Sequence, residues 1–298
     1  MPSEVLALLA AACWASSSLF SAAASGRMGA FAFTRWRMAF ASVVLWGAAL
    51  ASGGWRALTG EGLALLAASG LIGIFVGDTA LFACMNRLGP RRSGVLFATH
   101  SLFSVVLAWL WLGERMAGWQ LLGGALLAGG VMTAIALGKR DGESHQWEHT
   151  HGRLATGIGL GLLAALGQAL ATLMLKPLMA SAAVDAVTAS AVRMSAGFGA
   201  HALLWALGLS MTRLKQPLRW QDLCNTFASS GVSMVLGMTL VLKALESGSA
   251  GRVGMLSSVS PVLLLPLLWV VYSRRPALGA WCGAVLAVAG CTLILGQL

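Results

Sequence analysis

Long apolar stretches separated by short polar gaps run along the whole chain of 298 residues. A helix needs about 20 apolar residues to cross a hydrocarbon layer about 30 Å thick. Lipid offers no partner to backbone amides, and the stretches are much longer than the roughly ten alternating residues of a barrel strand. We therefore predict an all-α membrane protein. Ten spans are expected, at residues 4–24, 31–52, 62–86, 93–112, 118–138, 154–175, 184–209, 223–245, 250–272 and 278–298.

The second half of the chain repeats part of the first. Residues 77–137 can be laid over residues 237–297 without a gap. Identical pairs in this alignment are Gly77 with Gly237, Thr79 with Thr239, Arg92 with Arg252, Gly94 with Gly254, Trp109 with Trp269, Gly123 with Gly283 and Gly130 with Gly290. A repeat of five helices must begin from the opposite face in its second copy, so the pattern predicts two inverted five-helix repeats. We expect the first repeat at residues 1–138, a polar linker at 139–153 and the second repeat at 154–298.

Basic residues favour alternate gaps between the spans. The odd-numbered gaps hold Arg27, Arg87, Arg91, Arg92, Lys139, Arg140, Arg153, Arg213, Lys215, Arg219, Arg274 and Arg275. The even-numbered gaps hold little more than Arg56, Arg115, Lys176 and Arg252. The positive-inside rule then places the odd gaps in the cytoplasm and both termini outside.

The composition excludes a soluble globular domain, because 58% of the residues are hydrophobic and only 10% are charged. The formal net charge is +10, but the basic residues lie in short gaps where anionic lipid explains them, so we expect the lipid bilayer and no nucleic acid as a partner. The five cysteines fall within apolar spans without a CxxC pair, which predicts small buried side chains.

Motifs for other kinds of chemistry are missing from the sequence. It contains no GxxxxGK[ST] segment for ATP and neither GxSxG nor HExxH for hydrolysis, so we expect no cofactor and no enzymatic activity. Energy for transport would then come from a gradient. The linker segment HQWEHTH, at residues 145–151, brings histidines and a glutamate together, and a solvated linker is favoured there over a zinc or nickel site.

Asp78 is the carboxylate that lies well inside a predicted helix. Phe75, Asp78 and Phe82 follow a helical spacing that would place the acid between two aromatic rings on one face. A charge at membrane depth needs a partner, a wet cavity or a neutral protonation state. Two interpretations of Asp78 remain open at this point: it couples transport to protons, with His100 as a second proton carrier, or it pairs permanently with His100 or an arginine.

Further polar side chains lie at similar depth in other spans. Candidate substrate-binding residues are Trp14, Ser17, Ser18, Phe75, Asp78, Phe82, His100, Gln168, Thr172 and Ser257. Hydroxyl and amide groups suit the ammonium and carboxylate of a zwitterion, and aromatic rings suit apolar or stacking contact. Hydrogen bonding between helices is the alternative for the serines and threonines. Pro261 follows a serine cluster and predicts a bend in the ninth span.

The residues also resemble a known family. Trp14 in the first span, Arg37 in RWRMAF, Arg193 in AVRMSAG, and WLWLGER at 109–115 before a glycine-rich helix are similar to the EamA-type branch of the drug/metabolite transporter superfamily. This resemblance implies a multi-pass inner-membrane exporter of small metabolites, with amino-acid exporters among the better-known members. Members are usually drawn with cytoplasmic termini, opposite to the charge distribution, so the orientation stays open. For Arg37 and Arg193, anchoring the helix or holding a cap is favoured over the alternative, substrate binding.

The sequence therefore predicts a secondary transporter that exports small metabolites, in the first place amino acids, aromatic or other neutral ones, by alternating access through a central cavity. The alternatives are an exporter of lipophilic cationic drugs, which an acid between aromatic rings would also suit, and a non-transporting membrane interaction protein. The expected partners are the substrate, lipid and protons. Stripes of small residues, such as Gly279, Gly283 and Ala287, allow close helix contact within a monomer or across a homodimer.

Overall fold

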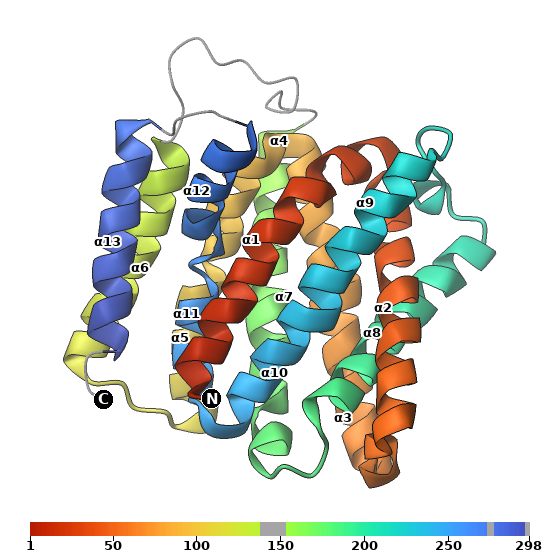
Figure 1. Cartoon of the computed structure of the whole chain (residues 1–298), viewed down its shortest axis with the longest axis horizontal. Coiled ribbons are helices and arrows are strands. Elements are labelled where there is room, and N and C mark those ends of the chain that lie inside the picture. Colours follow the sequence, from red (N-terminus) through yellow and green to blue (C-terminus); the bar gives the residue numbers. More distant parts are fainter. Residues whose placement is uncertain (138–152, 273–276, 296–298) are drawn as a thin grey trace.

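The computed structural model describes residues 1–137, 153–272 and 277–295, and these residues form helices without any strand. The all-α prediction is confirmed. The first half contains α1 (Ser3–Met28), α2 (Ala30–Ser52), η1 (Gly54–Ala57), α3 (Gly60–Gly70), η2 (Leu71–Asp78), α4 (Thr79–Ala98), α5 (His100–Leu112) and α6 (Gly118–Ala136). The bundle of helices is shown in Figure 1.

The second half follows the same order of long and interrupted helices. It contains α7 (Leu154–Ala180), α8 (Ala186–Ala206), η3 (Ser210–Thr212), α9 (Trp220–Ser230), η4 (Gly231–Gly237), α10 (Met238–Ser247), α11 (Ala250–Ser257), α12 (Ser260–Tyr272) and α13 (Leu278–Leu295). Within the described residues, five helices are long and apolar enough to cross a membrane by themselves. Helix is present in each of the ten predicted spans, but how many of them cross the bilayer stays a prediction.

The interruptions occupy matching places in the two halves. The segments η2 and η4 are both π-helical. The register of the gapless alignment, continued six residues before Gly77 and Gly237, places Leu71 over Gly231, where the two segments begin. The break between α4 and α5 at Thr99 likewise corresponds to the break between α11 and α12 at Ser258 and Val259. The bend expected before Pro261 is thus present, whereas the π-helical segments were not predicted. Such segments are rare and occur frequently at functional sites.

Glycines allow α6 and α13 to pack backbone against backbone, side by side in Figure 1. A Cβ atom on Gly123 would lie 2.9 Å from the carbonyl oxygen of Gly290, and one on Gly130 would lie 2.6 Å from that of Gly283. Residue numbers rise along one helix as they fall along the other, so the pair is antiparallel. The repeat alignment pairs Gly123 with Gly283 and Gly130 with Gly290. In the structure, Gly123 therefore contacts the counterpart of Gly130, and Gly130 contacts the counterpart of Gly123. The small-residue stripe of the last helix is used inside the monomer.

Large apolar side chains cover much of the outer surface. Val43 is 74% exposed, Leu110 65% and Val285 68%, on α2, α5 and α13 respectively. Apolar exposure on this scale is foreign to monomeric soluble proteins and typical of a surface that contacts lipid. Many large aliphatic residues of these helices thus face outward, where lipid would contact them.

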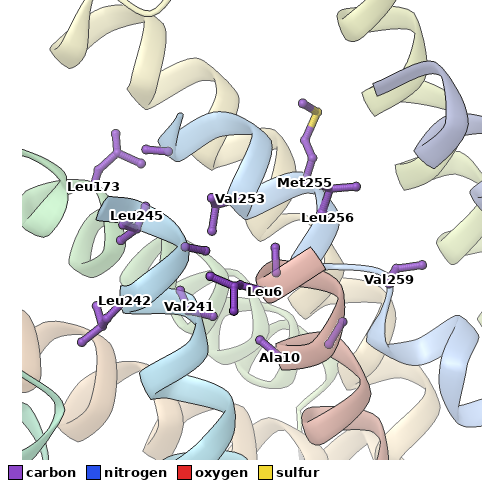
Figure 2. Packing of buried hydrophobic residues seen from close by; sticks show 14 of the residues in the cluster. Leu6, Ala10, Leu173, Val241, Leu242, Leu245, Val253, Met255, Leu256 and Val259 are labelled. Atoms are coloured by element: carbon purple, nitrogen blue, oxygen red, sulfur yellow. The ribbon is translucent and has the colours of Figure 1, made fainter. Parts of the chain in front are cut away.

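An apolar cluster fills the end of the bundle where the chain begins. Figure 2 shows side chains from α1, α7, α10 and α11 meeting there. Its labelled members, which we call the apolar cluster, are Leu6, Ala10, Leu173, Val241, Leu242, Leu245, Val253, Met255, Leu256 and Val259. Both halves of the chain contribute to it, so the two halves are held together at this end by buried apolar surface.

Glu114, the acid of the LGER segment, binds the first residues of a helix in the other half. Its carboxylate accepts hydrogen bonds from the backbone N–H groups of Ala250 at 2.9 Å and Gly251 at 3.1 Å, where α11 begins. A negative charge at a helix N-terminus satisfies orphan donors and complements the helix dipole. Glu114 therefore joins the end of α5 to the start of α11.

Replacing Glu114 by alanine is expected to lower the free energy of unfolding by about 1–2 kcal/mol, the usual cost of losing a helix cap. Thermal unfolding in detergent measures the change, with Glu61→Ala as the control because Glu61 is exposed and in the first turn of α3. Equal stability of the two variants would contradict the role of Glu114 as a cap.

Candidate functional site

Arg37 and Asp78 form an ion pair in the interior of the bundle. Nη1 of Arg37 donates to Oδ2 of Asp78 at 2.7 Å, and their side chains are only 2% and 13% exposed. Arg37 lies on α2, and Asp78 is the last residue of η2. Of the open interpretations of Asp78, pairing with an arginine is the arrangement that this structure has. Two charges at this depth stabilise each other, and each would be costly alone.

Serines of the eighth predicted span complete the environment of Arg37. Its Nη2 donates to the hydroxyl of Ser233 at 2.6 Å, and that hydroxyl donates to the carbonyl oxygen of Ser229 at 2.7 Å. The hydroxyl of Ser230 donates to the backbone carbonyl of Arg37 at 2.6 Å. The ion pair of the first half is thereby tied to α9 and η4 of the second half.

The first helix reaches the same serines. The hydroxyl of Ser229 lies 3.0 Å from that of Ser17 and 2.8 Å from that of Ser21. One turn earlier on α1, Nε1 of Trp14 donates to the carbonyl oxygen of Ser233 at 3.3 Å. Hydroxyls and an indole from α1 therefore extend the network around Arg37 and Asp78, which we call the central polar network.

Aromatic rings cover the guanidinium of Arg37. Its Cζ atom lies 4.8 Å from the ring centroid of Phe82 and 5.3 Å from that of Phe33. The two rings meet edge to face with their centroids 4.7 Å apart. Cation–π attraction supplements the ion pair in this desolvated place. Phe33 contributes from α2 without having been predicted as a site residue.

The other predicted ring, Phe75, contacts a histidine instead. Its centroid lies 4.9 Å from that of His201, whose Nε2 is 3.0 Å from the hydroxyl of Thr79. The predicted placement of Asp78 between Phe75 and Phe82 assumed the regular spacing of an α-helix. Phe75 and Asp78 lie in the π-helical segment η2, where that spacing does not hold.

The remaining candidates lie outside the central polar network. His100 is buried beside Phe97, with ring centroids 5.1 Å apart, and no hydrogen bond or ion pair joins it to Asp78. The hydroxyls of Ser18, Thr172 and Ser257 donate to carbonyl oxygens of their own helices, at 2.9, 2.8 and 3.0 Å. The amide of Gln168 donates to Thr172 at 3.5 Å. For these five residues, as for the other five candidates, substrate binding stays a prediction.

A pocket lies away from the central polar network. It opens between the connection from α5 to α6 and the start of α11, and its lining includes Glu114, Trp119 and Arg252. None of the ten predicted substrate-binding residues lines it. The histidine-containing linker segment 145–151 lies outside the described residues. In the described ranges, no group of three or more His, Cys, Asp and Glu side chains is placed to hold a metal ion.

Comparison with known proteins identifies the family. The model of the EamA-like transporter family matches residues 1–136 and again residues 155–296, one match in each half. A search of curated proteins finds no match. A solved structure, described only as the crystal structure of a protein, has the same fold, with a TM-score of 0.77, 18% identity, and coverage of 98% of this chain and 95% of the other. The chain belongs to the EamA-like transporter family, whose members are multi-pass membrane transporters of small molecules.

Proposed function

We propose that this protein exports amino acids across the inner membrane by alternating access, as a secondary transporter. The observation that carries the proposal is the central polar network, in which the Arg37–Asp78 ion pair is bound to Ser233 of the other half. Placing charged groups at membrane depth costs free energy, and such groups are typical of substrate or ion pathways. A network that spans both halves changes whenever one half moves relative to the other.

The two halves have opposite orientations in this proposal. Support comes from α6 and α13, which pack antiparallel with reciprocal glycine contacts, and from η2 and η4, which occupy matching places. Helices related by a two-fold axis in the membrane plane meet in this way. Alternating access would then consist of rocking one repeat against the other around the central polar network.

The apolar cluster acts as the closed gate in this arrangement. It joins α1 and α7 to α10 and α11 at the end of the bundle where α1 begins (Figures 1 and 2). Apolar side chains can separate and repack without leaving unpaired polar groups, which suits a surface that must open and close. The central polar network lies further along α1, at Trp14, Ser17 and Ser21.

The chemistry of the network favours a zwitterion over a lipophilic cation. Asp78 offers a carboxylate for an ammonium group, the buried arginines offer a guanidinium for a carboxylate, and Phe82 offers an apolar face. A lipophilic cation would have to displace Arg37 from Asp78, because the two are already paired. A zwitterionic amino acid brings both an ammonium group and a carboxylate, so it can bind a buried carboxylate and a buried guanidinium together.

Proton coupling is proposed at Asp78. When the halves separate and the ion pair opens, Asp78 can take up a proton on one side and release it on the other, as a carboxylate in a transport cycle does. In proteoliposomes, Asp78→Asn is expected to lower amino-acid accumulation driven by a pH gradient to the level seen without a gradient. Exchange of amino acids without a gradient should persist, because the amide oxygen of asparagine still accepts hydrogen bonds from Arg37 and from an ammonium group.

The assay uses radiolabelled Phe, Met, Thr and Lys with and without the gradient. Glu4→Gln is the matched control, because Glu4 also pairs with an arginine, Arg252 at 3.3 Å, but lies outside the network. Unchanged gradient-driven accumulation in Asp78→Asn would rule out proton coupling at this residue. Absence of flux for every amino acid in the wild type would rule out the proposed substrate class.

A further inference from the structure

Arg193 is a wholly buried arginine without a hydrogen-bond partner. Its exposure is 0%, and none of its three side-chain nitrogens has a donor–acceptor contact among the residues that the structure places. It occupies the same place on α8 as Arg37 does on α2: each is the eighth residue of its helix, and each is followed by a buried methionine, Met194 or Met38. The two arginines are therefore counterparts in different surroundings.

Neither partner that Arg37 uses has an equivalent beside Arg193. Under the alignment of the halves, Met238 stands where the first half has Asp78, and Gly73 stands where the second half has Ser233. Nη2 of Arg193 lies 3.3 Å from the position that a Cβ atom on Gly73 would occupy. The guanidinium thus reaches the matching place on η2 but meets a glycine without a hydroxyl.

Met238 adds no polar group near this place. It is 4% exposed and packs in a second group of buried apolar side chains, separate from the apolar cluster, with Ile74, Ala191 and Met194. A buried guanidinium held by neither a carboxylate nor a hydroxyl is unfavourable, because its desolvation is not offset by any partner. An arginine in this position needs an anion from outside the chain.

We propose that Arg193 is the binding site for the anionic group of the transported substrate, a carboxylate, in the conformation that follows the closed one. This inference rests on the proposed transport function and assigns the recognition of the carboxylate to a single residue. A guanidinium binds a carboxylate through two parallel hydrogen bonds, which no other side chain offers with the same geometry.

In this structure, the place beside Arg193 lies between η2, α7 and α8, which pack against one another. A Cβ atom on Gly73 would lie 2.6 Å from Cβ of Ala171 on α7, so the helices touch at this point. The substrate reaches Arg193 when η2 moves away from α7. Binding then supplies the counter-charge that the chain lacks, so the ligand favours the conformation in which it binds.

The test compares ligands that differ only in the anionic group. Binding of phenylalanine, phenylalaninamide and phenethylamine is measured on the purified protein by displacement of radiolabelled phenylalanine. Benzoate, benzamide and chloride are compared by the shift of the thermal unfolding midpoint, which separates a carboxylate site from a site for any small anion. The variants are Arg193→Gln, Arg193→Lys and Met238→Asp.

The wild type should prefer phenylalanine over its amide, and Arg193→Gln should bind phenylalanine about 10- to 100-fold more weakly while its affinity for the amide stays the same. Arg193→Lys should retain part of the preference through its charge. Met238→Asp should unfold at a higher temperature than the wild type and bind phenylalanine more weakly, because it gives Arg193 the carboxylate that Asp78 gives Arg37.

Several results would overturn the inference. One such result is that Arg193→Gln still prefers phenylalanine over phenylalaninamide. Another is that a stably folded Met238→Asp binds phenylalanine as tightly as the wild type does. Stabilisation by chloride as strong as that by benzoate would overturn the carboxylate assignment. If no amino acid binds but benzoate stabilises the wild type and not Arg193→Gln, the anion site stands and the proposed amino-acid substrate fails.

Discussion

Replacing Asp78 by alanine is expected to lower the free energy of unfolding by about 3–5 kcal/mol, the cost of breaking a buried ion pair from one side. The variant leaves the guanidinium of Arg37, which is 2% exposed, with only Ser233 as a hydrogen-bond partner. The charge itself remains buried and uncompensated. Equilibrium unfolding in mixed micelles measures this loss.

A double variant separates the ion pair from the shape of the site. Asp78→Ala together with Arg37→Met removes both charges, so most of the lost stability should return, because apolar residues in place of a buried pair are often neutral. The control is Glu246→Ala, since the pair of Glu246 with Lys243 lies at the surface, with Lys243 57% exposed. Its expected effect is within about 1 kcal/mol. If Asp78→Ala were as stable as Glu246→Ala, the ion pair would not hold the central polar network together.

The second large effect is expected at the contact between α6 and α13. Replacing Gly130 by valine should cost about 3 kcal/mol, the upper end of the range for overpacking. A Cβ atom there would lie 2.4 Å from the backbone nitrogen of Ala287, and a backbone atom cannot move aside as a side chain can. The two helices would have to separate along their length.

The chain provides a neighbouring control for this prediction. Gly129 is next to Gly130 in the same helix, and a Cβ atom on Gly129 meets nothing within 4 Å. Gly129→Val carries the same change in helix propensity without the clash, so the difference between the two variants isolates the helix contact. Gly283→Val should behave like Gly130→Val, because a Cβ on Gly283 would lie 2.5 Å from the carbonyl oxygen of Gly130. Equal stability of the variants at 129 and 130 would refute the backbone contact.

The two buried arginines show how a repeated architecture diverges. The halves keep the arginine, the methionine after it and the π-helical segment that each arginine faces. They differ in the carboxylate and the hydroxyl that receive its hydrogen bonds. The first half carries its own counter-charge, and the second half does not. In the proposed cycle, this difference separates a residue pair that responds to protons from a residue that receives the substrate.

The pattern of apolar stretches determined the helices and the two halves, because only helices and closed barrels satisfy the backbone in lipid and these stretches are too long for barrel strands. The sequence also singled out Asp78, since a lone carboxylate at membrane depth needs a partner, a wet cavity or a neutral protonation state. The alignment of Gly123 and Gly130 with Gly283 and Gly290 indicated where helices come close. Each of these inferences depends on residues near one another in the chain or on a direct repeat.

Only the tertiary structure decided which groups meet. It paired Asp78 with Arg37 rather than with His100, and it brought Ser229 and Ser233 beside α1 although they lie more than 200 residues from Ser17. Such contacts depend on how far each helix is rotated and where it crosses its neighbour, and the π-helical segments shift that rotation. Spacing along one helix contains no information on these angles. For the same reason, the sequence showed two similar arginines, and only the packing of the helices showed that Arg193 has no hydrogen-bond partner among the described residues.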